Sequence, residues 1–152
     1  MTRAYVGLGA NLGDRERSLR AAVDALAALD GIEVVAVSKL RETEPVGVGE
    51  QPGFLNGVVA LETTLSAREF LDRLLAVEQR FGRVRVPGEH SPRTLDLDLL
   101  LYGDERIDEP GLTVPHARLH ERRFVLEPLA ELAPEAVVPG RGGVESLLTA
   151  VH

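Results

Sequence analysis

The 152-residue sequence contains no cysteine and no tryptophan, and aromatic residues make up only 4% of it. The lack of cysteine excludes disulfide bonds and thiolate metal sites. The scarcity of aromatic side chains leaves few surfaces on which bases could stack, and the formal net charge of −7 disfavours contact with phosphate backbones. We therefore expect no nucleic-acid partner.

The sequence also lacks any apolar stretch of about 18 residues, the length typical of a transmembrane helix. Its first residues, Met1 to Gly7, contain no signal-peptide apolar run. We therefore expect a cytoplasmic protein with no membrane partner. The length favours a single domain over residues 1–152, and we expect that domain to be a monomer.

The apolar pattern predicts strands and helices in alternation. The predicted elements are a strand at 4–8, a helix at 15–29, strands at 32–40 and 54–63, a helix at 66–81, and a strand from residue 94. Residues 41–53 hold two prolines and three glycines, which predicts a long loop rather than a regular element. This βαββαβ order is typical of ferredoxin-like α+β folds, in which helices pack on an antiparallel sheet.

The last third of the chain is predicted to decorate this core with a helical extension. Residues 112–116 read as a short extended piece, 117–132 as a helix interrupted at Pro128, and 144–151 as a closing helix. Near the start of the chain, residues 9–13 are predicted to form a glycine-rich turn. A dinucleotide fingerprint is disfavoured there, because Gly13 lies one position too late for the GxGxxG spacing.

The most informative segment runs from Pro92 to Tyr102. Polar and apolar residues alternate strictly in it from residue 94 to 99, so Asp96 and Asp98 share one strand face. Their Cα atoms are expected to lie about 6.6 Å apart, two strand rises. Two such carboxylates can bind one hard cation or a close pair, and oxygen donors favour Mg²⁺ or Mn²⁺ over zinc. The alternative, the solvated face of an ordinary strand, stays open at this point.

Arginines precede this strand in a loop that contains Arg83, Arg85 and Arg93. Guanidinium groups bind the non-bridging oxygens of phosphates, so together with an aspartate pair they would supply both parts of a polyphosphate site. Solvated surface arginines remain the simpler interpretation when the loop is considered alone.

The segment from Pro92 to Leu99 resembles the signature of the 6-hydroxymethyl-7,8-dihydropterin pyrophosphokinase family, which transfers pyrophosphate from ATP to a pterin alcohol in folate biosynthesis. Further blocks resemble the same family in order along the chain, at residues 9–13, 43–47, 51–56, 82–85, 112–116 and 122–129. The resemblance therefore implies an ATP-dependent diphosphotransferase that releases AMP.

By this resemblance, Asp96 and Asp98 bind two Mg²⁺ ions that hold the ATP phosphates and the pterin hydroxyl, and Arg83 and Arg93 are catalytic arginines. The implied ATP-binding residues are Glu78, Arg83, Arg85, Arg93, Leu99, Thr113, His116 and Arg122. Leu99 would contribute backbone and shape rather than charge.

The resemblance also implies a slot for the flat pterin ring between Phe54 and Phe124, with Asn56 at the ring edge. The implied pterin-binding residues are Thr43, Pro45, Val46, Phe54, Asn56, Asp96 and Phe124. The expected partners are ATP and 6-hydroxymethyl-7,8-dihydropterin, with a functional hand-off of the product to dihydropteroate synthase.

One departure and two alternatives accompany this interpretation. His90 stands where the family commonly has a tryptophan that closes over the pterin.

A non-catalytic, metal-dependent ligand-binding module of ferredoxin-like fold would explain the fold but not the aspartates and arginines together. A kinase that releases ADP is disfavoured, because neither a Walker motif nor a kinase catalytic-loop pattern occurs.

Overall fold

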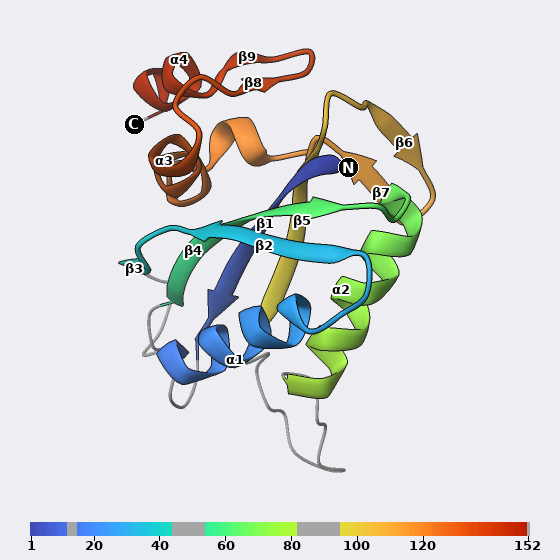
Figure 1. The fold of residues 1–152 in the computed structure, drawn as a ribbon. Coiled ribbons are helices and arrows are strands. Elements are labelled where there is room, and N and C mark those ends of the chain that lie inside the picture. The colour runs from blue at the N-terminus through green and yellow to red at the C-terminus, as the bar shows by residue number, and fades with distance from the viewer. Residues whose placement is uncertain (12–14, 44–53, 82–94, 152) are drawn as a thin grey trace.

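An antiparallel sheet with helices packed on both faces forms the centre of the molecule (Figure 1). The computed structural model describes residues 1–11, 15–43, 54–81 and 95–151. The elements are β1 (Thr2–Ala10), α1 (Arg15–Ala27), β2 (Ile32–Val37), β3 (Arg41–Thr43), β4 (Phe54–Thr63), α2 (Ala67–Phe81), β5 (Asp96–Tyr102), β6 (Ile107–Glu109), β7 (Leu112–Val114), a 3₁₀ helix (Leu119–Glu121), α3 (Arg123–Leu132), β8 (Val137–Val138), β9 (Gly142–Gly143) and α4 (Val144–Ala150).

The main sheet has the strand order β2-β4-β1-β5, and β3 pairs with the beginning of β4. Every pairing in it is antiparallel. Gly9 on the central strand β1 lies opposite Asn56 of β4 on one side and Asp96 of β5 on the other. This register places residues that are far apart in sequence in one row across the sheet.

Helices α1 and α2 cover one face of the sheet (Figure 1). Their buried residues recur at helical spacing, for example Leu19 and Leu26 on α1 and Phe70 and Leu74 on α2. Burying one such side chain stabilises the fold by about 1.5–3 kcal/mol. Ser66 and Glu69, which have the spacing of a capping box, form one at the start of α2: the Glu69 N–H donates to Ser66 Oγ (3.2 Å) and the Ser66 N–H donates to Glu69 Oε1 (3.1 Å).

Helices α3 and α4 cover the opposite face and form a second core. Val58 and Leu100 of the sheet meet Leu126 and Leu129 of α3 there, with Val144 of α4 alongside. The predicted antiparallel sheet with packed helices is confirmed. The C-terminal third nevertheless forms part of the core, because without it this sheet face would be exposed to water.

The structure corrects several predicted elements. Residues 41–43 form strand β3 instead of the start of a loop, because their backbone pairs with β4. Gly9 belongs to strand β1 and not to a turn, since β1 stays paired on both sides as far as this residue. The two-stranded pairs β6-β7 and β8-β9 were not predicted.

The helix predicted at residues 117–132 begins only at Arg123, after a short 3₁₀ helix. Pro128 does not interrupt it. Its buried ring packs in the interior of the protein, which offsets the cost of the missing backbone donor. In the described ranges no helix has the length and apolar character needed to span a membrane.

Candidate active site

A cavity of about 500 Å³ lies between the α3 side of the sheet and the start of α3. It brings together a group of residues that the sequence interpretation assigned to the site, namely Thr43, Phe54, Asn56, Asp96, Asp98, Arg122 and Phe124. These residues come from β3, β4, β5 and the beginning of α3. Only the sheet register and the packing of α3 place them around one space.

The floor of the cavity is formed in part by two glycines of β1. Gly9 lies between Asn56 and Asp96, and Gly7 lies opposite Asp98. A Cβ atom on Gly9 would lie only 3.1 Å from Asn56 Oδ1. The sequence predicted that these glycines shape a turn through which the backbone approaches a ligand or the sheet. The structure places Gly7 and Gly9 within strand β1 instead, and a glycine in a strand likewise permits such a close approach.

The two aspartates project from β5 on the cavity side. Asp96 is half-buried and Asp98 is exposed, whereas Leu97 between them is buried in the core under α1 and α2. The alternation predicted from the sequence is confirmed for this strand. The donor set fits Mg²⁺, which binds one or two protein carboxylates and takes its remaining ligands from water and substrate phosphates. Among the described residues no cluster of three or more metal-binding side chains was found, so a metal here would depend on this pair.

The backbone between the aspartates is held by Glu78 of α2. The Leu97 N–H donates to Glu78 Oε2 at 2.7 Å, and Glu78 is only 4% exposed. Glu78 therefore fixes the strand that carries both carboxylates. It does not line the cavity, and its predicted contact with ATP stays a prediction.

His116 lies close to Asp98 on the loop that follows β7. The backbone N–H of His116 donates to the Leu100 carbonyl oxygen (3.0 Å), and the ring Nδ1 accepts from the backbone N–H of Arg118 (3.3 Å). Burial lowers the pKa of His116 below the ordinary value of 6.5; Asp98 acts in the opposite direction, and Arg122 and Arg118 add to the lowering. The neutral imidazole is therefore the favoured form beside the cavity.

The two other residues of the predicted nucleotide group lie outside this cavity. Thr113, like His116, lines a neighbouring cavity. Leu99 has its side chain in the core under α1 and α2, and its predicted contact with ATP stays a prediction.

The predicted pterin slot is shaped by contacts among its own residues. The Asn56 side-chain amide donates to Thr43 Oγ1 at 2.5 Å, which fixes the orientation of that amide. Phe54 and Phe124 both line the cavity, and the Arg122 guanidinium lies 5.6 Å from the centre of the Phe124 ring. This cation–π contact holds the ring and leaves a cationic group at the cavity wall.

Strand β3, which carries Thr43, is held against α3 by an ion-pair network that the sequence did not indicate. Arg41 pairs with Glu131 (2.6 Å) and Glu127 (3.3 Å), and Glu131 also accepts from the Lys39 N–H (3.0 Å). Burial alone would raise the pKa of Glu131, but these partners outweigh it and the pKa is lowered. Charges about 90 residues apart in the sequence thus help to position one wall of the site.

The remaining predicted site residues, Arg83, Arg85, Arg93, Pro45 and Val46, lie outside the described residues, as does His90. Their assigned roles stay predictions.

Comparison with known proteins identifies the family. Residues 5–134 match the family model described as 7,8-dihydro-6-hydroxymethylpterin-pyrophosphokinase (HPPK). The chain is 46% identical over 148 residues to the 2-amino-4-hydroxy-6-hydroxymethyldihydropteridine pyrophosphokinase of Pseudomonas aeruginosa, which covers 97% of this chain and 91% of the relative. The Bacillus subtilis protein of the same name is 45% identical over 132 residues, covering 87% of this chain and 78% of the relative.

Among solved structures, the chain resembles wild-type Plasmodium falciparum HPPK-DHPS with pteroate, with a TM-score of 0.77 and 13% sequence identity. The match covers 98% of this chain and 44% of the Plasmodium chain, and at this identity it supports the fold alone. The family model and the close relatives carry the assignment. The chain belongs to the 7,8-dihydro-6-hydroxymethylpterin-pyrophosphokinase family.

Proposed function

We infer that this chain is an ATP-dependent pyrophosphokinase of folate biosynthesis. It transfers pyrophosphate from ATP to the hydroxymethyl group of 6-hydroxymethyl-7,8-dihydropterin and releases AMP. The single observation that carries the assignment of the site is the cavity in which an aspartate pair, an amide and two phenylalanines meet in a member of this family.

For the pterin, we assign the slot between Phe54 and Phe124. Two aromatic faces suit a flat heterocycle, and Asn56 offers a carbonyl oxygen and its second N–H to the ring edge. Thr43 supports this role because it fixes the Asn56 amide. Pro45 and Val46 complete the proposed slot by family resemblance.

For the phosphates, we assign Asp96 and Asp98 as the residues that would hold Mg²⁺, which when bound neutralises charge on phosphate oxygens. Arg122 faces the same cavity, and the neutral His116 can donate a hydrogen bond to an oxygen through Nε2. Arg83, Arg85 and Arg93 are proposed phosphate ligands by resemblance. Glu78, Leu99 and Thr113 are proposed at the nucleotide side.

In the proposed reaction, the pterin hydroxyl oxygen attacks the β-phosphorus of ATP in line. A bond forms between these two atoms, the bond from the β-phosphorus to the oxygen bridging it to the α-phosphorus breaks, and AMP leaves. The hydroxyl proton could pass to Asp98, whose exposed carboxylate lines the cavity. Fixing both substrates in this geometry would supply much of the rate enhancement.

The finer architectural assignments are also proposals. The strand order β2-β4-β1-β5, with helices between β1 and β2 and between β4 and β5, supports the ferredoxin-like arrangement. A single domain, a monomer and a place in the cytoplasm stay predictions from the sequence. The hand-off of the product to dihydropteroate synthase likewise stays a prediction, because the Plasmodium HPPK-DHPS match supports the fold alone.

The test is to separate the products formed from ATP, Mg²⁺ and the reduced hydroxymethylpterin. We expect AMP and the pyrophosphorylated pterin in equal amounts, and we expect Asp96→Asn and Asp98→Asn each to lower kcat by at least about 100-fold. Asp72→Asn, an exposed carboxylate on α2, is the matched control and should be fully active. ADP as product, or tight nucleotide binding without turnover, would contradict the proposal and support the alternative functions.

A further inference from the structure

Strand β3 is short, and its backbone pairing alone holds it weakly. Its residues, Arg41 to Thr43, pair only with β4 among the described strands, so β3 lies at an edge of the sheet (Figure 1). So few backbone hydrogen bonds contribute little to stability. The position of β3 therefore depends on contacts made by its side chains.

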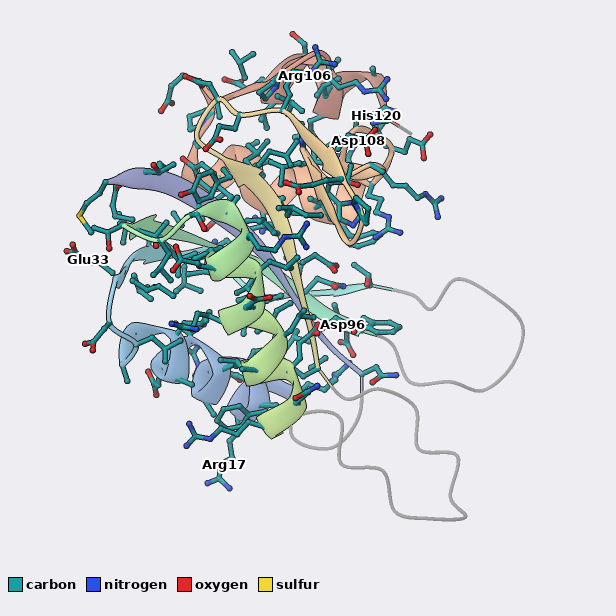
Figure 2. All side chains as sticks on the ribbon, turned by 90° about the vertical axis from the view of Figure 1, so that its right-hand side faces the viewer. Arg17, Glu33, Asp96, Arg106, Asp108 and His120 are labelled. Atoms are coloured by element: carbon teal, nitrogen blue, oxygen red, sulfur yellow. The ribbon has the colours of Figure 1, made fainter. Side chains whose placement is uncertain are left out.

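This strand supports one wall of the proposed pterin slot. Thr43 is directly opposite Phe54, and Arg41 is directly opposite Asn56. Residues directly opposite each other in an antiparallel pair share a sheet face, so Arg41 lies in the row that leads through Asn56 to Asp96. Figure 2 shows Asp96 at the same end of the sheet as β3. A displacement of β3 would thus move this wall of the slot.

The opposite wall, Phe124, shares one face of α3 with two glutamates that bind Arg41. Glu127 and Glu131 follow Phe124 at the i+3 and i+7 positions, which lie on the same side of a helix. Arg41 Nη2 lies 2.6 Å from Glu131 Oε1, and Arg41 Nε lies 3.3 Å from Glu127 Oε1. A rotation of α3 about its axis would break both contacts and move the Phe124 ring at the same time.

The two glutamates use all four of their carboxylate oxygens in this network. Glu131 Oε2 accepts from the backbone N–H of Lys39 (3.0 Å), just before β3. Glu127 Oε2 binds Arg123 Nε (3.2 Å), at the first residue of α3. The side chains of Arg41 and Glu131 are only 30% and 31% exposed. A partly shielded network of this kind holds its partners more firmly than an isolated surface ion pair does.

We propose that Arg41 is a positioning residue that sets the distance between Phe54 and Phe124, the two aromatic walls of the pterin slot. This inference rests on the proposed function, because it assigns Arg41 a role in binding the pterin. A guanidinium group suits the task, since its planar fork binds two carboxylates at once in fixed directions. A slot of fixed width selects a flat ring over a puckered one, because a thicker ligand enters only if the walls separate.

Binding of two pterins of different shape tests the proposal. The ring system of 6-hydroxymethylpterin is aromatic and flat, whereas the pyrazine ring of its 5,6,7,8-tetrahydro form is puckered. Calorimetric titrations are made under anaerobic conditions, with a saturating non-hydrolysable ATP analogue and Mg²⁺ present. We expect Arg41→Met to raise the Kd of the flat pterin about fivefold and to lower the preference for it over the puckered form at least about threefold. The Kd of the ATP analogue alone should be unchanged.

Control variants separate positioning from a general loss of stability. Arg3→Met removes another arginine–glutamate pair, with Glu62 at 2.7 Å, from the far end of the same sheet, and should bind both pterins normally. Arg41→Lys keeps the charge but lacks the planar fork, so its Kd values should lie between those of Arg41→Met and the wild type. If Arg41→Met does not fold, Glu127→Gln, which weakens one of the two ion pairs, replaces it with the same expected direction of change.

Two results would overturn the proposal while leaving the proposed function intact. One is an unchanged preference for the flat pterin in Arg41→Met, and the other is an equal loss of affinity for the pterin and the ATP analogue. A lower thermal midpoint with normal pterin binding would likewise show that Arg41 only stabilises the fold. Failure of the wild type to bind either pterin would instead contradict the proposed function, and this inference with it.

Discussion

The Asn56 side-chain amide donates a hydrogen bond to the Thr43 hydroxyl across the β3-β4 pair, at 2.5 Å. The bond uses one of the two N–H groups of the amide and thereby fixes which way its carbonyl oxygen points. A residue that reads the edge of a heterocycle needs such a fixed orientation, because a flipped amide exchanges donor and acceptor. Thr43 is therefore a positioning residue for Asn56.

Thr43→Val removes the acceptor but keeps the shape of the side chain. We expect the KM for the pterin to rise about threefold to tenfold, the value of one neutral hydrogen bond, with the KM for ATP unchanged. Steady-state kinetics with each substrate varied in turn provides the measurement. Thr43→Ser keeps the hydroxyl and should behave like the wild type; equal effects of both substitutions would show that the hydrogen bond to the hydroxyl does not by itself account for the loss.

Gly9 and Gly7 offer a matched pair of alanine substitutions on one strand. In Gly9→Ala the new methyl group would lie 3.1 Å from Asn56 Oδ1, whereas in Gly7→Ala its nearest contact, with Leu100, is 3.5 Å. We expect Gly9→Ala to displace Asn56 and weaken pterin binding about tenfold, by analogy with the loss of one well-placed polar contact. Gly7→Ala should bind the pterin nearly normally, and calorimetric titration of both variants compares them. Equal affinities would argue against a spacing role for Gly9.

Substitutions of Glu78 test whether its hydrogen bond to Leu97 stabilises β5, the strand that carries Asp96 and Asp98. Glu78→Ala leaves the buried Leu97 N–H without its partner, and we expect the free energy of unfolding to fall by about 2–3 kcal/mol. Glu78→Gln keeps an oxygen acceptor of the same reach and should cost about 1 kcal/mol. Urea denaturation followed by circular dichroism measures both. If the two variants are equally stable, the hydrogen bond to β5 does not hold the strand.

His116 provides a prediction on pH. Its ring should titrate below 6.5, and because Asp98 raises the pKa while Arg122 lowers it, Asp98→Asn should move the pKa further down and Arg122→Gln should move it up. Proton NMR of the ring measures all three values. Shifts of the same sign in both variants would contradict the proposed neighbours.

The same lowered pKa links His116 to stability. The unfolded chain binds a proton at this ring more readily than the folded protein does, so stability is retained above the ordinary pKa of 6.5 and is lost as the pH falls below it. Relative to His116→Gln, the wild type should therefore lose stability on acidification through this range. Thermal unfolding of both proteins at several pH values provides the comparison.

The sequence by itself determined much of the local structure. The alternation around Asp96 and Asp98, the Ser66–Glu69 capping box and the apolar spacing of α1 and α2 are short-range patterns, and the structure confirms each of them. These patterns suffice because helix and strand periodicity depends on residues only two to four positions apart. The family blocks added the candidate site residues, and the cavity gathers a large part of them.

Only the tertiary structure decided which residues meet. The row from Asn56 through Gly9 to Asp96 depends on the pairing of three strands. The ion pair between Arg41 and Glu131 depends on where α3 packs against the sheet. Pro128 was expected to interrupt a helix but lies within α3, and residues 41–43 were expected to begin a loop but form strand β3. In both places long-range packing or strand pairing outweighed the local preference. Contacts between residues separated by tens of positions leave no periodic signal in a single sequence, so the shape of the site became visible only in the folded protein.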